Sequence, residues 1–340
     1  MSNTKWYQRS GNQGDVVIST RIRLARNLQR MPFPAAMTVE QKKTVADQLF
    51  EVLLEREGES FSHIRMNTLD ELQALSLVER HLISPEFARR GEGEALVLSA
   101  DESVSIMSCE EDHLRIQVMR SGLDLDGAFQ EADCWDTYLD NRLHFAFDER
   151  LGYLTQCPSN LGTGMRASLM LHLPALQEKG IVQQLSATVS KLGLTIRGLY
   201  GEGSGSKGAI YQLSNQVTLG ITEAEAIENL KGIAEQIIKE ERHHRQELGE
   251  TLAAQDRIFR SLGILKHARL LSGKEFMSLI SQVRMGVSLQ LIEGVTLDRL
   301  GALLVDAQAA TLSLANGDSP DAAKRDALRA EMVRECLKGV

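Results

Sequence analysis

The sequence predicts an α+β protein, in which an antiparallel β-sheet flanked by α-helices is followed by a helical C-terminal domain. Strand-like segments with alternating apolar and polar residues concentrate before residue 220, and helical patterns fill almost all of the chain after it. This segregation favours a sheet with helices packed on one side. We expect the sheet-containing domain over residues 15–248 and the helical domain over residues 249–340.

The individual elements follow from the spacing of the apolar residues. Strands are expected over residues 15–27, 95–100, 103–118, 194–200 and 209–219, and helices over 38–58, 165–178, 180–192 and 222–248. In the third strand, Leu114, Ile116 and Val118 alternate with His113, Arg115 and Gln117. One face of this strand is therefore expected in the core and the other face is polar and available. Thr222 and Glu225 form a capping box that begins the long amphipathic helix, and a polar break at 316–321 interrupts the C-terminal helices.

Composition excludes several classes of protein. The chain has 340 residues, of which 43% are hydrophobic and 25% are charged, and these values are ordinary for a globular protein. Its net charge of -8 argues against non-specific nucleic-acid binding. No run approaches the roughly 18 apolar residues of a membrane span, and the N-terminus lacks a signal-peptide pattern, so we predict a cytoplasmic protein with no membrane partner. The four cysteines contain no CxxC pair, which argues against a disulfide framework or a zinc site.

The segment 157–164 (CPSNLGTG) combines a thiol, a proline-set turn and two glycines. Arg166 follows it, where we expect a helix to begin. Such a loop can present backbone amides and a cation to an anion. A free cysteine is commonly a buried packing residue, but this electropositive setting favours an activated thiol at Cys157.

Five arginines stand beside strand or loop signals. They are Arg21, Arg23, Arg115, Arg166 and Arg197. Arginine keeps its charge and offers a planar fork that matches phosphate oxygens. Each one alone could be a solvated surface residue, but together they favour a polyphosphate site. The chain has no Walker-type loop and no HRD or DFG segment, which argues against P-loop and protein-kinase chemistry.

Two acidic residues, Glu111 and Glu202, suit a guanidinium substrate. Taken singly, each is more often a solvated acid. A guanidinium is a poor nucleophile because its lone pair is delocalised and it stays protonated near neutral pH. One carboxylate can hold two of its N–H groups while another accepts the proton, and arginines can neutralise the transferring phosphoryl group.

Four ordered motifs, STRIRLARN, EEDHLRI, CPSNLGTGMRAS and RGLYGEGS, are similar to those of the phosphagen (guanidino) kinase family. The resemblance spans residues 15–220 and implies a phosphagen kinase/glutamine synthetase-like catalytic domain over 15–248. It implies that Glu111 and Glu202 contact the guanidinium, with Glu111 favoured as the base, and that Cys157 lies beside it. It further implies ATP contacts by Ser19, Thr20, Arg21, Ile22, Arg23, His81, Arg115, Arg166, Ala167, Ser168, Leu169, Met170, Arg197, Gly198, Leu199, Tyr200, Gly201 and Glu202. Mg²⁺ would be held by the ATP oxygens and water, without a protein metal site.

Two features separate the chain from the phosphagen kinases of small metabolites. The STRIRLARN strand begins at Ser19, so the helical domain that precedes the catalytic domain in those enzymes is expected to be missing. Near the C-terminus, RDALRA resembles the RDxxRA motif of bacterial protein-arginine kinases. That resemblance implies a phosphoarginine-binding, allosteric pocket made by Arg325, Asp326, Arg329 and Ala330. Similarity to that subfamily includes RHLISP, DRIFRSLGIL and LRAEMVRE, and runs nearly end to end.

The resemblance implies a kinase that phosphorylates arginine in proteins and marks them for degradation in a stress response. The expected partners are protein substrates with exposed arginine, a zinc-binding activator protein, an ATP-dependent protease complex and a second copy of the chain. Two alternatives remain: a phosphagen kinase acting on a free guanidino compound, and a non-catalytic adaptor that binds phosphoarginine.

Overall fold

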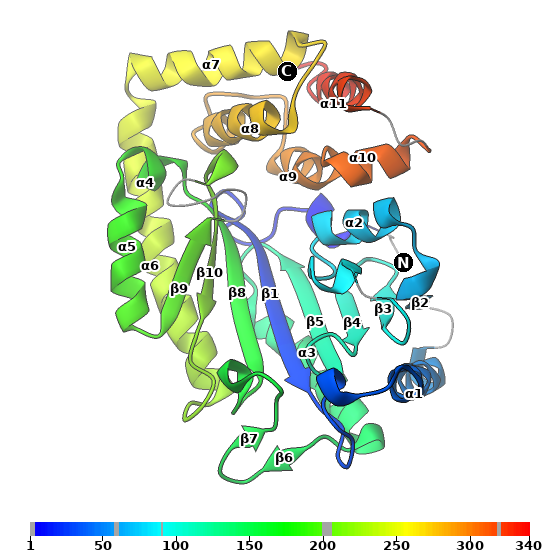
Figure 1. Cartoon of the computed structure of the whole chain (residues 1–340). Helices are drawn as coiled ribbons and strands as arrows, with labels where there is room; N and C mark the ends of the chain where they lie inside the picture. Colours follow the sequence, from blue (N-terminus) through cyan, green and yellow to red (C-terminus); the bar gives the residue numbers. More distant parts are fainter. Residues whose placement is uncertain (1–3, 58–60, 90, 199–205, 318–320) are drawn as a thin grey trace.

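The computed structural model describes residues 4–57, 61–89, 91–198, 206–317 and 321–340. An eight-stranded sheet runs through these residues in the order β2-β3-β4-β5-β1-β8-β10-β9, and every neighbouring pair is antiparallel (Figure 1). Its strands are β1 Val17–Arg26, β2 Phe61–Arg65, β3 Ala95–Ser99, β4 Val104–Ser108, β5 Leu114–Ser121, β8 Met165–His172, β9 Leu194–Gly198 and β10 Ile210–Asn215. A separate hairpin is formed by β6 Phe147–Asp148 and β7 Gly152–Tyr153.

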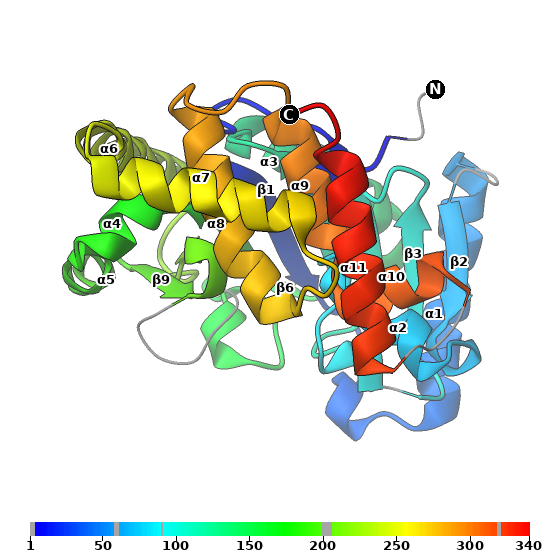
Figure 2. The same cartoon turned by 90° about the horizontal axis from the view of Figure 1, so that it is seen from above.

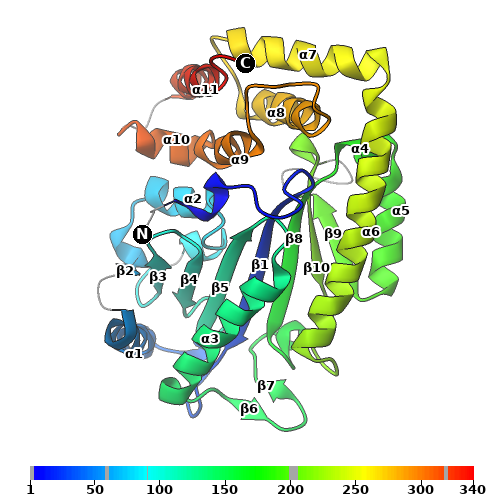
Figure 3. The same cartoon turned by 180° about the vertical axis from the view of Figure 1, so that it is seen from behind.

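The back face of the sheet carries the main hydrophobic core. The helices against it are α1 Val39–Glu57, α3 Leu125–Leu143, α5 Ile181–Lys191 and α6 Glu223–Gly249. Figure 3 shows α3 and α6 crossing this face. Period-two alternation sends Ile22 and Leu24 of β1 into the core, where both are almost completely buried. The intervening Arg21 and Arg23 must therefore project from the front face.

The described elements cover the front face at one edge. There α2 Glu71–Glu79 and the segment after it pack on β3 and β4 through Leu77, Leu96 and Met107. Figure 1 shows no helix lying across β5, β1 and β8 on this side. The central strands therefore present their polar alternation toward an open face.

The helices that follow α6 form a layer over one end of the sheet, as seen from above in Figure 2. They are α7 Leu252–His267, α8 Gly273–Ser288, α9 Leu297–Asp306, α10 Ala309–Ala315 and α11 Ala322–Cys336. Helices α7, α8, α9 and α11 share a second core, which also includes Ile210 of β10. The short helix α4 Pro174–Glu178 and the 3-10 turns complete the elements: η1 Trp6–Gln8, η2 Pro34–Ala36, η4 Met66–Thr68, η5 Phe87–Arg89, η6 Pro158–Asn160 and η7 Lys207–Ala209.

The predicted fold class is confirmed, but two predicted elements were wrong. The segment 165–178 is helical only in its last part, Pro174–Glu178; its first part is β8, in which Met165, Ala167, Leu169 and Leu171 are buried with period two. The segment 103–118 is two strands, β4 and β5, which are joined by a turn at 109–113. The capping box of Thr222 and Glu225 is present at the start of α6. Among the described residues, no helix has the length and apolar character needed to cross a membrane.

Candidate active site

All five predicted arginines share the front face of the sheet. Strand register places them there: Arg23 lies opposite Arg166, Arg115 opposite Ala25, Arg21 opposite Ser168, and Arg197 opposite Gln212. Residues paired in this way project to the same side of an antiparallel sheet. Arginines that are far apart in the sequence thus form one band across β5, β1, β8 and β9.

Arg21 is held in a fixed orientation by two polar residues on neighbouring strands. Its Nη2 donates to Gln212 Oε1 at 2.9 Å, and its Nε lies 3.4 Å from Ser168 Oγ. Burial, with the charges of Arg115 and Arg166, lowers the pKa of Arg21 to about 10. Gln212 belongs to none of the sequence motifs, although its place between buried Tyr211 and Leu213 in the strand pattern puts it on the polar face.

Arg23 has the least favourable electrostatic surroundings of the five arginines. Burial lowers its pKa well below the usual range, and Arg21, Arg115 and Arg166 lower it further. Its Nε is buried and finds no hydrogen-bond acceptor within the part of the chain that the structure describes. A buried donor among cations is stabilised by an anion, so the electrostatics of this position favour a bound phosphate group.

Two cavities meet at this band of arginines. The larger, of about 710 Å³, is bordered by Arg21, His81 and Glu110 among others. The smaller, of about 230 Å³, is bordered by Cys157, Asn160 and Arg166. Arg23, Glu111 and Arg115 line both cavities. A phosphate chain in the first and a nucleophile in the second would meet between these three side chains.

The turn between β4 and β5 carries two carboxylates with different surroundings. Glu110 is buried, ion-paired with Arg115 at 2.6 Å and hydrogen-bonded by Ser84 Oγ at 2.8 Å. The side chain of Glu111 is 37% exposed, and its Oε2 accepts from Asn160 Nδ2 at 3.2 Å and lies 3.5 Å from Arg115 Nη2. Glu110 therefore positions Arg115, while Glu111 reaches into the shared region. Neither Glu110 nor Asn160 was recognised as a contact in the sequence analysis.

Cys157 lies at the rim of the smaller cavity. It is half-buried, its Sγ is 3.1 Å from Ser159 Oγ, and its carbonyl accepts from Thr155 Oγ1 at 2.8 Å. The following loop packs closely on β1, since a Cβ on Gly164 would lie 2.7 Å from the Ala25 carbonyl oxygen, and its φ is +61°. This close approach explains why glycine ends the loop. Arg166 then projects from β8. Its pKa is lowered by burial and by the charges of Arg197 and Arg115, and the nearby Cys157 and Glu111 offset only part of this shift.

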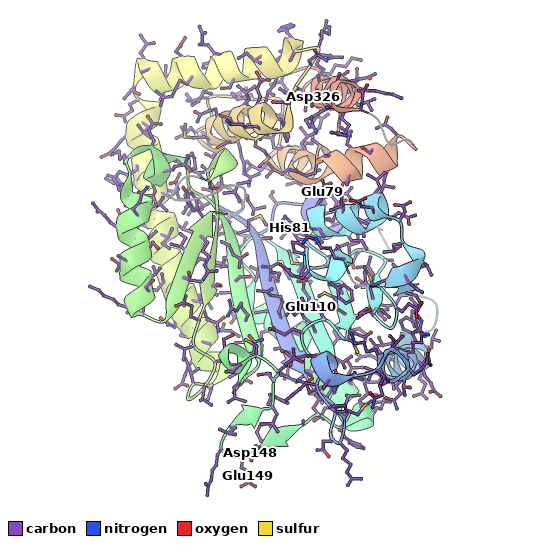
Figure 4. All side chains as sticks on the ribbon, viewed as in Figure 1. Glu79, His81, Glu110, Asp148, Glu149 and Asp326 are labelled. Carbon is purple, nitrogen blue, oxygen red and sulfur yellow. The ribbon has the colours of Figure 1, made fainter. Side chains whose placement is uncertain are left out.

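His81 borders the larger cavity from the segment after α2. Burial, with the charge of Arg21, lowers its pKa to about 3, so its imidazole is neutral near pH 7. Its carbonyl accepts from Gln117 Nε2 at 2.8 Å, which attaches this segment to the sheet. Figure 4 shows Glu79, His81 and Glu110 following one another down this side of the molecule.

The remaining residues of the predicted ATP site occupy three different environments. Ser168 and Met170 are on the front face, whereas the side chains of Ile22, Ala167 and Leu169 are buried in the core behind the sheet. Ser19 and Thr20 are buried in β1, and Gly198 ends β9. Leu199, Tyr200, Gly201 and Glu202 lie outside the described residues.

In the RDALRA segment on α11, Arg329 is buried and links this helix to the segments that contain Ala307 and Leu271. Its Nε donates to the Ala307 carbonyl at 2.8 Å, and its Nη1 donates to the Leu271 carbonyl at 2.8 Å and to Asp326 Oδ1 at 2.7 Å. Ala330 is completely buried and Arg325 is half-buried. Figure 4 places Asp326 above the α9–α10 layer, away from His81. The predicted phosphoarginine pocket stays a prediction.

The described part of the site suits a metal carried by the nucleotide. Glu110 and Glu111 both face Arg115, so they are not arranged as a cation cage. A grouping of possible metal ligands, His243, His244 and Glu247, lies on α6, where the Lys179 ammonium already contacts His244 and Glu247.

Comparisons with known proteins agree with this geometry. The ATP:guanido phosphotransferase C-terminal catalytic domain matches residues 42–244, and the protein-arginine kinase McsB C-terminal domain matches residues 251–340. The chain is 45% identical over 324 residues to the protein-arginine kinase of Caldanaerobacter subterraneus subsp. tengcongensis, covering 94% of this chain and 96% of that one. It is 43% identical over 343 residues to the protein-arginine kinase of Moorella thermoacetica, covering 99% and 98% of the two chains.

Solved structures resemble the fold. The duplicated taurocyamine kinase from Schistosoma mansoni, with bound transition-state analogue components, matches with a TM-score of 0.63 at 23% identity. The match covers 78% of this chain and 41% of that one. Lombricine kinase matches with a TM-score of 0.61 at 23% identity, and 72% and 70% of the two chains are covered.

Proposed function

Because the chain belongs to the protein-arginine kinase branch of the ATP:guanido phosphotransferases, we propose that it transfers the γ-phosphoryl group of ATP to arginine side chains of protein substrates. One observation carries the proposal. The larger and smaller cavities share Arg23, Glu111 and Arg115, so a phosphate donor and a guanidinium acceptor would meet between two cations and a carboxylate.

The arginine band supplies the phosphate side of the reaction. Arg21, Arg23 and Arg115, which line the larger cavity, would hold the triphosphate and neutralise its charge, and Mg²⁺ bound to the nucleotide would neutralise further charge. Phosphoryl transfer needs little covalent chemistry from a protein, so positioning and electrostatic stabilisation dominate. The fixed orientation of Arg21 on Gln212 fits this role, because the cations are placed before the nucleotide arrives.

The smaller cavity supplies the guanidinium side. Glu111 accepts the proton that the attacking nitrogen must lose, and Cys157 lies on the same cavity wall, where its sulfur orients the guanidinium. Glu202, outside the described residues, is proposed as the second carboxylate. Entry of an arginine side chain from another protein requires the cavity to remain accessible from the front face, which no described helix crosses in Figure 1.

A transfer assay tests the proposal and separates it from its alternatives. The chain is incubated with ATP-Mg and either an unfolded protein or free arginine, and the phosphate on arginine is measured by its acid lability and by mass spectrometry. Phosphate on protein arginine supports the proposal. Transfer to free arginine alone would instead identify a phosphagen kinase, and absence of transfer would favour a phosphoarginine-binding adaptor.

We also propose that Arg325 and Asp326 take part in binding phosphoarginine and that occupancy stimulates the kinase. Titration with free phosphoarginine, compared between the wild type and Asp326→Ala, tests this role. Unchanged binding and unchanged activity in the variant would contradict it. A cytoplasmic setting, a homodimer, a zinc-binding activator and delivery of marked proteins to an ATP-dependent protease belong to the same proposal, and co-purification followed by sizing tests the partners.

A further inference from the structure

The buried carboxylate of Asp112, in the β4–β5 turn, is hydrogen-bonded to two other segments that carry predicted site residues. These are the end of β1 and the loop that contains Cys157. We propose that Asp112 is a positioning residue for phosphoryl transfer, which holds the Glu111 turn and the Cys157 loop in register through Asn27. The proposal rests on the function proposed above, because it assigns a role within that reaction. Asp112 itself does not line either cavity as described.

The contacts of Asp112 converge on one oxygen. Its Oδ1 accepts from Asn27 Nδ2 at 2.6 Å and from the backbone N–H of Gln156 at 2.7 Å. Asn27 follows the end of β1, and Gln156 immediately precedes Cys157. One oxygen therefore joins the β4–β5 turn, the end of the arginine-bearing strand and the cysteine loop.

Asn27 continues the connection in both directions. Its Nδ2 also donates to the Leu154 carbonyl at 2.9 Å, and its Oδ1 accepts from the His113 N–H at 2.9 Å. His113, completely buried, accepts from the Leu28 N–H at 2.9 Å. The Asp112–Asn27 pair is thus held from the turn, the strand and the loop, and a shift of one segment would displace the others.

Burying the Asp112 carboxylate lowers the stability of the folded chain. A residue kept only for stability would not be expected to do so. Asp112 is 2% exposed, and its Oδ2 has no partner within the described residues. A buried oxygen without a donor destabilises a fold, and an apolar residue at this position would avoid that cost. Residues that lower stability in this way are typical of functional sites.

The consequence for chemistry follows from what the three segments carry. Glu111 adjoins Asp112 in the chain, and its carboxylate is met by Asn160 from the cysteine loop at 3.2 Å. If Asp112 no longer anchors Gln156, the loop with Cys157 and Asn160 can move relative to Glu111. A misplacement of about 1 Å can reduce a rate about 100-fold without affecting binding elsewhere. The arginine band, held by strand pairing, would keep its affinity for ATP.

The experiment compares three variants of the full chain: Asp112→Ala, Asp112→Asn and Glu241→Ala. Asparagine retains the acceptor at Oδ1 and offers a donor in place of the unpaired Oδ2. Glu241 is the control for loss of a buried carboxylate, because it is completely buried and accepts from the Ala175 and Leu176 N–H groups at 3.1 and 2.9 Å, away from the arginine band. Unlike Asp112 it is also ion-paired, with Arg245 at 2.6 Å, so its removal should cost at least as much stability. All measurements are made at a temperature where circular dichroism shows each variant folded.

Two readouts are needed: steady-state transfer to protein arginine, and the alkylation rate of Cys157 followed by peptide mapping. We expect Asp112→Ala to lower kcat about 100-fold with the KM for ATP unchanged within about threefold. Its Cys157 should be alkylated several-fold faster than in the wild type. Asp112→Asn should restore kcat to within about fivefold, and Glu241→Ala should leave both kcat and alkylation near wild type.

Failure of this proposal is distinguishable from failure of the proposed function. Wild-type kcat in Asp112→Ala, or an equal loss in Glu241→Ala, would overturn the positioning role. So would an Asp112→Asn variant as inactive as Asp112→Ala, because the charge and not the anchoring would then matter. A chain that phosphorylates no protein arginine would contradict the proposed function, and the alkylation rates would still decide whether Asp112 holds the loop.

Discussion

Arg23 on β1 lies directly opposite Arg166 on β8 in the antiparallel register. Like charges at directly opposed positions destabilise a sheet, and the lowered pKa of each guanidinium reflects burial and the surrounding arginines. The strand pair is therefore built at a cost that a bound anion would remove. If ATP binds at this pair, as proposed, relief of the repulsion between the two guanidinium groups would contribute part of the binding free energy.

Replacing Arg23 by methionine should stabilise the nucleotide-free chain and weaken ATP binding. Methionine fills similar space without the buried charge, so we expect the free energy of unfolding to rise by about 1 kcal/mol. Loss of a charge-assisted contact to phosphate should lower ATP affinity about 10- to 100-fold. Thermal denaturation and calorimetric titration check the two effects.

Arg120→Met is the control for this prediction. Arg120 lies on β5, opposite Thr20 of β1, but its side chain is 42% exposed and ion-paired with Glu131. It should change ATP affinity little. An Arg23→Met variant that binds ATP like the wild type would remove Arg23 from the phosphate site.

Replacing Glu111 by glutamine should abolish most of the transfer while ATP remains bound. Glutamine keeps the size of the side chain and a hydrogen-bond acceptor for Asn160, but it cannot take the proton of the attacking nitrogen. General-base loss of this kind lowers kcat about 100- to 10,000-fold. The KM for ATP and kcat are measured together, with Glu86→Gln on the rim of the larger cavity as a control. If Glu111→Gln kept wild-type kcat, another group would be the base.

The order and type of most elements could be predicted from sequence, because single-sided burial leaves a clear period in the chain. In β5, Leu114, Ile116 and Val118 are buried as expected. The segment from Met165 to Leu171 misled the prediction because alanine, leucine and methionine are also strong helix formers. Its period-two burial becomes decisive only when β1 and β10 are seen on either side of it.

Candidate site residues could be predicted where the residue type itself indicates a chemical role. They could not be predicted where the role depends on contacts in the folded chain. The arginines indicate a phosphate site by their chemical character, whereas the guanidinium substrate was predicted from the resemblance of four motifs to the phosphagen kinase family. Gln212, Asn27 and Asp112 carry no such signal, because their roles arise from strand register and from contacts between distant segments. Sequence periodicity places Gln212 on a polar face but cannot say that Arg21 is its partner.

Removing the carboxylate of Glu79 should loosen the C-terminal helices from the sheet domain. Glu79, at the end of α2, accepts from the backbone N–H groups of Ala310 and Thr311 at 3.0 and 2.8 Å and from Thr311 Oγ1 at 2.9 Å. It thereby caps the N-terminus of α10 from another part of the fold. We expect Glu79→Ala to lower the free energy of unfolding by about 1–2 kcal/mol, measured by urea denaturation.

Glu71→Ala, in the exposed first turn of the same helix α2, is the matched control and should cost only a few tenths of a kcal/mol. Equal losses in the two variants would mean that the contact with α10 contributes nothing beyond the charge itself.

The neutral, half-buried His81 should make the chain less stable in mild acid. Its pKa falls from 6.5 to about 3 on folding because burial and Arg21 disfavour the imidazolium. Between these two values the unfolded chain binds a proton that the folded chain does not. The stability is therefore complete above pH 6.5 and is lost as the pH falls toward 3. At pH 5 the loss from this one group is about 1–2 kcal/mol.

Asn is a suitable replacement for His81, because the residue has a φ of +63° that asparagine tolerates and because asparagine does not titrate. The free energies of unfolding of the wild type and His81→Asn are compared at pH 7 and pH 5, so that groups common to both proteins cancel. The wild type should lose about 1–2 kcal/mol more than the variant over this interval. Parallel pH profiles would show instead that His81 is protonated as readily in the folded chain as in the unfolded one. The conclusion that a neutral imidazole borders the larger cavity would then be wrong.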